Sequence, residues 1–198
     1  MKRLENHIKS LFIYIRNNDK EAFNALFRLY YSNLLRFAKN YVSNTGQAEE
    51  VVSDVFVWLW QNRETLASVD NPQVYLFTAV KNRCFNVLRS SSKTVSLDEY
   101  RESENDFPEN PLSEMEQREL TDKLRAITNA LPEQQRLVFN MVKQNGLTAK
   151  QTAEILQLSP RTVETHLYKA IKQLEQEITD YLGYSPKKKQ MNTIMLSF

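Results

Sequence analysis

The chain has 198 residues, of which 41% are hydrophobic and 25% charged, as in a soluble protein with one large or two small cores. Only 3 Gly and 6 Pro, without alternating strand-like runs, argue against a β-rich fold and predict an all-α protein. The formal net charge of +2, taken over the whole chain, says little about nucleic acid as a partner.

The charge is distributed unevenly along the chain. Residues 1–90 and 118–198 each carry 12 Lys or Arg against 8 Asp or Glu, whereas residues 91–117 carry 2 against 8. This acidic segment, which contains Pro108 and Pro111, is too polar to fold by itself. We therefore predict two small helical domains joined by an acidic flexible linker: residues 1–90, the linker 91–117, residues 118–183, and a tail at 184–198.

Helical periodicity predicts two helices at the start of the first domain. Apolar residues recur at helical spacing from Leu4 to Ile15, after which Asn17-Asn18-Asp19 breaks the helix and can cap the next one. We expect the second helix to end near Ser43. Its aromatic-rich stripe is far more typical of a core than of a cofactor site: Phe23, Leu26, Phe27, Tyr30, Leu34, Phe37, Ala38 and Tyr41.

A third helix is predicted from about Gln47 to Glu64. Its buried stripe consists of Ala48, Val51, Val52, Val55, Phe56 and Leu59. On the opposite face, Val57 and Trp58 stand among polar and acidic side chains: Gln47, Glu50, Asp54 and Gln61. An exposed tryptophan beside acids is typical of a protein interface. A tryptophan packed under a neighbouring helix fits the same periodicity, so both interpretations stay open.

A fourth helix is predicted to begin near Pro72, after a loop at residues 66–71. It mixes aromatics, amides and cations: Tyr75, Phe77, Lys81, Asn82, Arg83, Phe85, Asn86 and Arg89. Single-stranded nucleic acid is bound by such a mixture, because bases stack on aromatics, amides pair with base edges and cations bind phosphates. A helix packed on its apolar side, with scattered surface charge, gives much the same pattern.

The segment from Leu147 to Gln176 predicts two helices and a tight turn. Thr148 and Gln151 fit a capping box, and Ser159 can cap a second helix that begins with Pro160. One face of this second helix is apolar: Val163, Leu167, Ala170, Ile171, Leu174 and Ile178. The opposite face suits a recognition helix in the DNA major groove: Arg161, Thr165, Tyr168, Lys169 and Lys172. A solvated helical hairpin is the alternative, but the two caps favour a helix-turn-helix.

No enzyme is indicated by the sequence. The two histidines lie in separate domains and Cys84 is the single cysteine, so we expect no zinc cluster and no disulfide. The three glycines are isolated, which excludes a Gly-rich phosphate loop. We expect no catalytic residue, metal, cofactor or small-molecule substrate. No apolar run spans a bilayer and no signal-peptide core is present, so we expect a cytoplasmic protein without membrane insertion.

Three segments together resemble a known family. The run from Ala48 to Trp60, the Tyr75-Leu76-Phe77 helix and the helix-turn-helix resemble an extracytoplasmic-function (group 4) RNA polymerase sigma factor of the sigma-70 family. The similarity covers roughly residues 15 to 180, in the family's order, and is closest to sigma factors of Bacteroidetes-type bacteria. It implies an initiation factor that binds core polymerase, recognises the minus-35 and minus-ten promoter elements and helps to melt DNA.

The resemblance also implies a role for each surface. Glu50, Asp54, Val57, Trp58 and Gln61 would bind a coiled coil of the polymerase's largest subunit. The minus-ten element would be bound and melted by Leu66, Tyr75, Lys81, Asn82, Arg83, Asn86 and Arg89, with Asn82 and the loop from Leu66 to Asp70 forming a pocket for a flipped base. The minus-35 element would be read by Arg161, Thr162, Thr165, Tyr168 and Lys169. Residues 120–130 and 133–144 would form the helices that support this reader.

The sequence departs from the family pattern at several positions. Asn86 stands where an aspartate is common, and Ser90-Ser91-Ser92 follows Arg89 instead of a basic cluster. Glu164 would repel phosphate unless it accepts from a cytosine amino group. The resemblance further implies an anti-sigma factor as a regulatory partner. Two alternatives are a DNA-binding regulator with an N-terminal sensory or dimerisation domain, and a helical adaptor protein.

Overall fold

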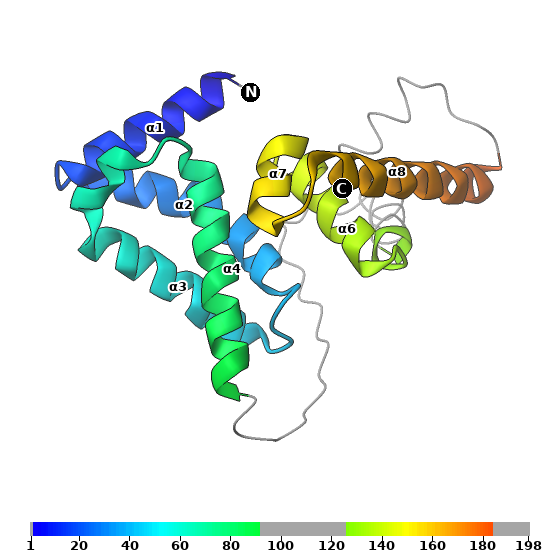
Figure 1. The fold of residues 1–198 in the computed structure, drawn as a ribbon, viewed down its shortest axis with the longest axis horizontal. Helices are drawn as coiled ribbons and strands as arrows, with labels where there is room; N and C mark the ends of the chain where they lie inside the picture. The colour runs from blue at the N-terminus through cyan, green and yellow to red at the C-terminus, as the bar shows by residue number, and fades with distance from the viewer. Residues whose placement is uncertain (1, 92–125, 184–198) are drawn as a thin grey trace, which may run out of the picture. The chain divides into compact units, whose positions relative to one another are not determined.

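The computed structural model of the chain describes residues 2–91 and 126–183, with the side chains of residues 2–6, 67 and 91 left outside the description. The described residues contain helices and no strand, which confirms the all-α prediction (Figure 1). The chain divides into two compact units, residues 1–103 and 104–198, and the division falls inside the predicted linker. Most of that linker and the whole predicted tail lie outside the described residues. No described helix has the length and apolar character needed to cross a membrane.

The first unit is built from α1 (Lys2–Arg16), α2 (Lys20–Ala38), α3 (Thr45–Gln61), the 3-10 helix η1 (Arg63–Ser68) and α4 (Pro72–Ser91). Asp19 caps α2, because its Oδ1 accepts the amides of Glu21 and Ala22 at 2.9 and 3.0 Å. Asn44 caps α3 by accepting the amide of Gln47 at 3.1 Å. These caps satisfy amides that a helix leaves unpaired, and they explain why the chain turns at the two predicted breaks.

One core holds the helices of the first unit together, since α2 packs on α1, α3 and α4. The predicted stripe of α3 is buried at all six positions. The other helices also contribute fully buried side chains: Ile8, Ile15, Leu26, Leu34, Phe37, Leu76 and Phe77. Each such side chain contributes about 1.5–3 kcal/mol when it leaves water, which fixes the outward directions of α3 and α4.

Two predicted boundaries in the first unit were wrong. Helix α2 ends at Ala38 and does not reach Ser43, because the Asn40 side chain donates to the carbonyls of Arg36 and Phe37 at 2.9 and 3.1 Å and replaces the next helical turn. The predicted loop at residues 66–71 is helical up to Ser68. There the Ser68 hydroxyl donates to the carbonyl of Thr65 at 2.8 Å.

The second unit contains α6 (Glu133–Phe139), the π-helix η2 (Asn140–Gln144), α7 (Ala149–Leu156) and α8 (Pro160–Leu182), preceded by a helical turn at residues 126–129. The predicted helix at 133–144 is thus helical throughout, with a change of winding after Phe139. Of the predicted helix at 120–130, residues 120–125 lie outside the described residues.

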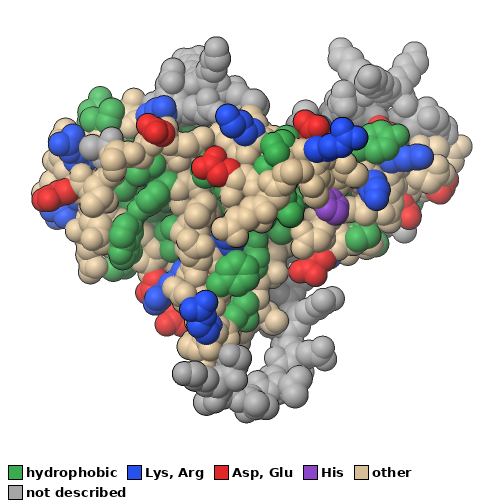
Figure 2. Space-filling model, viewed as in Figure 1, with side chains coloured by type: hydrophobic (Ala, Val, Ile, Leu, Met, Phe, Trp, Pro, Cys, Tyr) green, Lys and Arg blue, Asp and Glu red, His purple; other side chains and the backbone are tan. Residues whose placement is uncertain are grey.

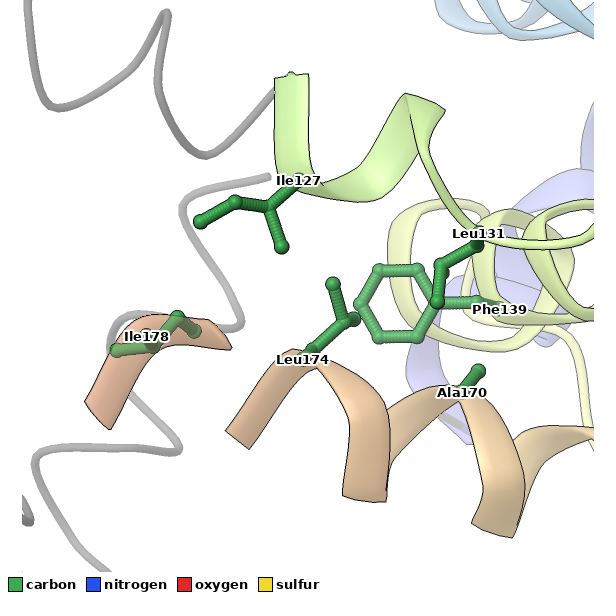
Figure 3. Close-up of a cluster of buried hydrophobic side chains, with 6 residues drawn as sticks. All are labelled: Ile127, Leu131, Phe139, Ala170, Leu174 and Ile178. Carbon is green, nitrogen blue, oxygen red and sulfur yellow. The ribbon is translucent and has the colours of Figure 1, made fainter. Parts of the chain in front are cut away.

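A compact cluster of six buried side chains packs α8 against the preceding helices. In Figure 3 the Phe139 ring points toward Leu174 of α8, with Leu131 beside it. Ile127, Ala170 and Ile178 complete the cluster. The apolar face predicted for α8 is therefore its buried face, and the opposite face is left to solvent.

The turn between α7 and α8 is fixed by local hydrogen bonds. Thr148 and Gln151 form the predicted capping box, with distances of 3.2 Å from the Gln151 amide to Thr148 Oγ1 and 2.8 Å from the Thr148 amide to Gln151 Oε1. Ser159 Oγ accepts the amide of Thr162 at 3.0 Å. Between them Gln157 has a left-handed φ of 59°, and the Leu158 amide bonds back to the carbonyl of Ala153 at 2.9 Å, as in a Schellman motif.

Replacing Thr148 by alanine is expected to lower the free energy of unfolding of the second unit by about 1 kcal/mol, because one amide of α7 loses its side-chain acceptor. Thermal denaturation followed by circular dichroism measures the change. Thr165→Ala is the matched control. The Thr165 hydroxyl donates to the carbonyl of Arg161 at 2.8 Å, and the helix does not depend on this bond. Equal losses in the two variants would contradict the capping role.

Candidate functional site

The outer face of α3 carries apolar side chains that remain in solvent. Val57 is 54% exposed and Trp58 is 48% exposed, and Glu50 and Gln61 beside them are also exposed. The Trp58 ring lies 6.3 Å from the ring of Tyr75 on α4, in a tilted contact that leaves about half of its surface open. The neighbouring helix α4 therefore covers only part of Trp58, and the role of Trp58 in a protein interface stays a prediction. Figure 2 shows hydrophobic side chains at the surface of this unit, among acidic and basic ones.

Tyr75 contacts the α3 face rather than standing alone on α4. Its ring lies between Trp58 and Phe12 of α1, with an edge contact of 6.1 Å to Phe12. The Tyr75 hydroxyl is buried without a hydrogen-bond partner, and burial raises its pKa because the phenolate would lose hydration. The ring of Tyr75 thus makes aromatic contacts with both Trp58 and Phe12.

The outward face of α4 presents amides and cations. Asn82, Asn86 and Arg89 are exposed and lie at i, i+4 and i+7, so they share one face of the helix. Arg83, also exposed, turns toward α3, where its Nε donates to Asp54 Oδ2 at 3.0 Å and its terminal nitrogen makes a second, shorter contact with the same oxygen. Four of the seven residues predicted for this surface are therefore accessible together.

The prediction that Leu66 and Lys81 contact DNA is contradicted by the burial of both side chains. Leu66 is 2% exposed, because η1 packs on α1 and its leucine enters the core. Lys81 is 5% exposed and lies on α4 one turn from Phe77 and Cys84, which are both fully buried. Burial lowers the pKa of Lys81, since the ammonium form loses hydration. Neither side chain reaches the outward face of α4 in this conformation.

Two exposed apolar residues on α4 were not among the residues assigned to the minus-ten surface. Phe85 is 48% exposed and Leu88 is 42% exposed, and the Phe85 ring makes an edge contact of 5.5 Å with Tyr41. Phe85 lies three residues after Asn82 and four before Arg89, so it borders the same face. The sequence had indicated Phe85 as one of the aromatics of this helix that could stack on bases, but Phe85 was not assigned to the minus-ten surface although its spacing from Asn82 and Arg89 was available.

The outward face of α8 has the predicted composition. Arg161, Thr165, Lys169 and Lys172 are exposed, and Tyr168 is 66% exposed. Figure 2 shows basic side chains along this helix. Thr162 is half-buried and its hydroxyl lies 2.7 Å from Ser159 Oγ, so it belongs to the helix cap as well as to the predicted surface.

Two observations concern reactive or metal-binding groups in the described residues. The single cysteine is buried, and burial raises the pKa of Cys84 to about 11, so its thiolate is disfavoured. Within residues 2–91 and 126–183, no three His, Cys, Asp or Glu side chains gather as a metal site requires. What the described surfaces offer is an apolar and acidic face, an amide and cation face, and a basic helix face.

Comparisons with known protein families give two matches in this chain. Residues 26–94 match the family described as Sigma-70 region 2, and residues 121–174 match Sigma-70, region 4. The first match contains α3 and α4, and the second contains α6, α7 and the start of α8 with its outward face. No curated protein sequence matches the chain.

Solved structures with the same fold include two that were determined with a bound partner. CnrH, in complex with the cytosolic domain of CnrY, is 17% identical with a TM-score of 0.54, covering 88% of this chain and 98% of CnrH. The sigma factor RpoE from Bartonella quintana, in complex with the anti-sigma factor NepR, is 18% identical with a TM-score of 0.55, covering 79% of this chain and 96% of RpoE. At this identity the similarity establishes the fold.

Proposed function

This chain belongs to the sigma-70 family of RNA polymerase sigma factors, the initiation factors that bind core polymerase and give it promoter specificity, and on that premise we propose how its three surfaces divide the work. The outer face of α3 binds core polymerase. The outward face of α4 binds the minus-ten element as it melts. The outward face of α8 reads the minus-35 element as duplex.

The polymerase-binding proposal is carried by the exposure of Trp58. A tryptophan that is 48% exposed, next to a valine that is 54% exposed, is costly to leave in water and is typical of the centre of a protein interface. The acids Glu50 and Asp54 at the margin of this patch favour a basic partner surface. The family's contact, a coiled coil of the polymerase's largest subunit, is our proposed partner.

The minus-ten proposal rests on Asn82, Asn86 and Arg89, with Phe85 added at their border. Unpaired bases expose both their faces and their hydrogen-bonding edges, so an exposed aromatic next to amides can stack one base while the amides bind another. Arg89 supplies a cation for the backbone at the end of this face. Leu66 and Lys81 take no direct part and instead hold η1 and α4 in place from the core.

The minus-35 proposal rests on the direction of α8. Its buried face is filled by the cluster around Phe139, so Arg161, Thr165, Tyr168 and Lys169 point away from the unit together. Arginine can bind a guanine edge through two hydrogen bonds, and lysine binds phosphate as a point charge. The capped N-terminus at Ser159 adds the positive end of the helix dipole to this surface.

Nothing in this division of labour requires a nucleotide, a metal or a cofactor, and we propose that the protein acts in the cytoplasm as a non-enzymatic factor. We further propose that an anti-sigma factor regulates it by covering the α3 and α4 faces. The support is that RpoE, which shares the fold, was solved with the anti-sigma factor NepR. Kinship with the Bacteroidetes-type factors stays a prediction.

Trp58→Ala is expected to weaken binding to bacterial core polymerase by about tenfold, or about 1.4 kcal/mol, because truncation removes the central apolar contact of the face. Competition with a labelled sigma factor for core polymerase measures the change. Tyr14→Ala is the matched control, since Tyr14 is 54% exposed on α1, outside the three proposed surfaces.

Run-off transcription from a genomic fragment library completes this test. Specific transcripts with the wild type, reduced with Trp58→Ala and retained with Tyr14→Ala, would support the proposal. A wild-type protein that never binds core polymerase but shifts a DNA duplex by itself as a dimer would instead point to the DNA-binding regulator. Tolerance of alanine on both α3 and α8 would favour the helical adaptor.

A further inference from the structure

The proposed polymerase face and the proposed minus-ten face meet at one ion pair. Asp54 lies on α3 between Glu50 and Trp58, one helical turn from each. Arg83 lies on α4 beside Asn82 and one turn before Asn86. The two side chains are 29 residues apart in sequence and are joined by two contacts from the guanidinium to Asp54 Oδ2.

In the free protein, the carboxylate of Asp54 and the guanidinium of Arg83 bind each other. A carboxylate acts only as an acceptor and a guanidinium only as a donor. Asp54 therefore accepts the same guanidinium hydrogen bonds that Arg83 would donate to a DNA phosphate. In the same way Arg83 neutralises the carboxylate that Asp54 would present to a basic polymerase surface. The side chains are 39% and 48% exposed, so both can be reached by an outside partner without unfolding.

We propose that the Asp54–Arg83 ion pair couples polymerase binding to promoter binding, an inference that rests on the proposed function. When a cation of the polymerase pairs with Asp54, the ion pair breaks and Arg83 can bind the melted strand. When a phosphate of the DNA pairs with Arg83, the ion pair breaks and Asp54 can bind the polymerase. Because coupling between two ligands is reciprocal, each binding event strengthens the other by the same factor.

The size of this effect is set by the strength of the pair. Exposed ion pairs are weak, and the strength usual for such pairs corresponds to about two- to fivefold in an equilibrium constant. The coupling is therefore a modest bias toward the assembled state. It is also screened by salt, so all variants are compared at one ionic strength of about 0.1 M.

A double-mutant cycle tests the coupling through affinity for core polymerase. Arg83→Gln is expected to tighten core binding about two- to fivefold, because Asp54 no longer has to break its ion pair with residue 83 before it binds the polymerase. Asp54→Asn is expected to weaken core binding. In the Asp54→Asn background, Arg83→Gln is expected to have no further effect, since there is no ion pair left to break.

The sign of the Arg83→Gln effect separates coupling from a purely structural role. If the pair only holds α3 against α4, Arg83→Gln will weaken core binding and lower the unfolding temperature, and the proposal is overturned. Unchanged core binding in Arg83→Gln overturns it as well. Arg28→Gln, which removes an exposed cation from α2, is the control for general charge, and tightening of similar size in that variant would also reject the coupling.

The same experiment distinguishes a failure of the coupling from a failure of the proposed function. If the wild-type protein binds core polymerase but the cycle shows no interaction energy between Asp54 and Arg83, the ion pair is rejected as a coupling element. The proposal that the α3 face binds core polymerase is then unaffected. Wild-type protein that does not bind core polymerase at all rejects both.

Discussion

Phe139→Ala is expected to lower the free energy of unfolding of the second unit by about 3–5 kcal/mol. The Phe139 ring is fully buried and points into the cluster that joins α6 to α8, so its removal leaves a cavity between the two helices (Figure 3). A loss of this size is comparable with the whole stability of a small domain. Urea denaturation followed by circular dichroism should show the second unit unfolding at much lower urea concentration.

The functional consequence should be confined to the second unit. Minus-35-dependent transcription should be lost, while the first unit keeps its affinity for core polymerase. Phe139→Leu, which keeps most of the apolar volume, should cost less than about 1.5 kcal/mol. Tyr168→Ala, at a side chain that is 66% exposed, should stay within about 0.5 kcal/mol of the wild type. A stable Phe139→Ala variant would mean that the cluster does not hold α8 in place.

Local signals allowed the helix-turn-helix to be predicted almost completely. The caps at Thr148 and Ser159 involve partners only three residues away, so the letters alone specify the hydrogen bonds. The left-handed residue of the turn was not predicted, because Gln157 occupies a position where glycine is usual. The hydrogen bond of the next amide, from Leu158 to Ala153, shows what that conformation provides.

Burial across elements was harder to predict than helix periodicity. Leu66 and Lys81 were assigned to the DNA surface through the family resemblance, Leu66 as part of the loop that would hold a flipped base and Lys81 as a cation of the helix that would bind the minus-ten element. Contact between η1 and α1 buries the first, and the turn of α4 between Phe77 and Cys84 buries the second. The contact between η1 and α1 has no local signature, because it depends on how distant helices pack. The position of Lys81, one turn from both Phe77 and Cys84, could have been read from the helical spacing.

The pairing of Asp54 with Arg83 shows the same limit at the candidate site. Asp54 was predicted to lie on the outer face of the third helix, and Arg83 was assigned to the minus-ten surface of the fourth, so the two residues were assigned to different partners. Their contact spans 29 residues and follows from the packing of α3 on α4, which periodicity does not specify. The sequence thus indicated part of each outward face, whereas it gave no sign of the contact between Asp54 and Arg83.

Replacing both Arg161 and Lys169 by alanine is expected to reduce use of the minus-35 element roughly a hundredfold. An arginine bound to a guanine edge contributes about 1–3 kcal/mol of discrimination, and loss of a phosphate contact lowers the salt dependence of binding by about one counterion. Both side chains are exposed on α8, away from the buried cluster, so the free energy of unfolding should not change. Run-off transcription and duplex binding at several salt concentrations measure the effect.

The single variants separate the two kinds of contact. Arg161→Ala should relax sequence preference at one base pair, whereas Lys169→Ala should weaken binding equally for all sequences and reduce the salt slope by about one. Lys143→Ala, on η2 rather than α8, is the control for loss of a positive charge in the same unit. Core polymerase binding should be unchanged in every variant. Equal losses of core binding and promoter binding would show that α8 does not act as a separate reader, because a helix face devoted to DNA has no reason to affect the polymerase contact made by α3.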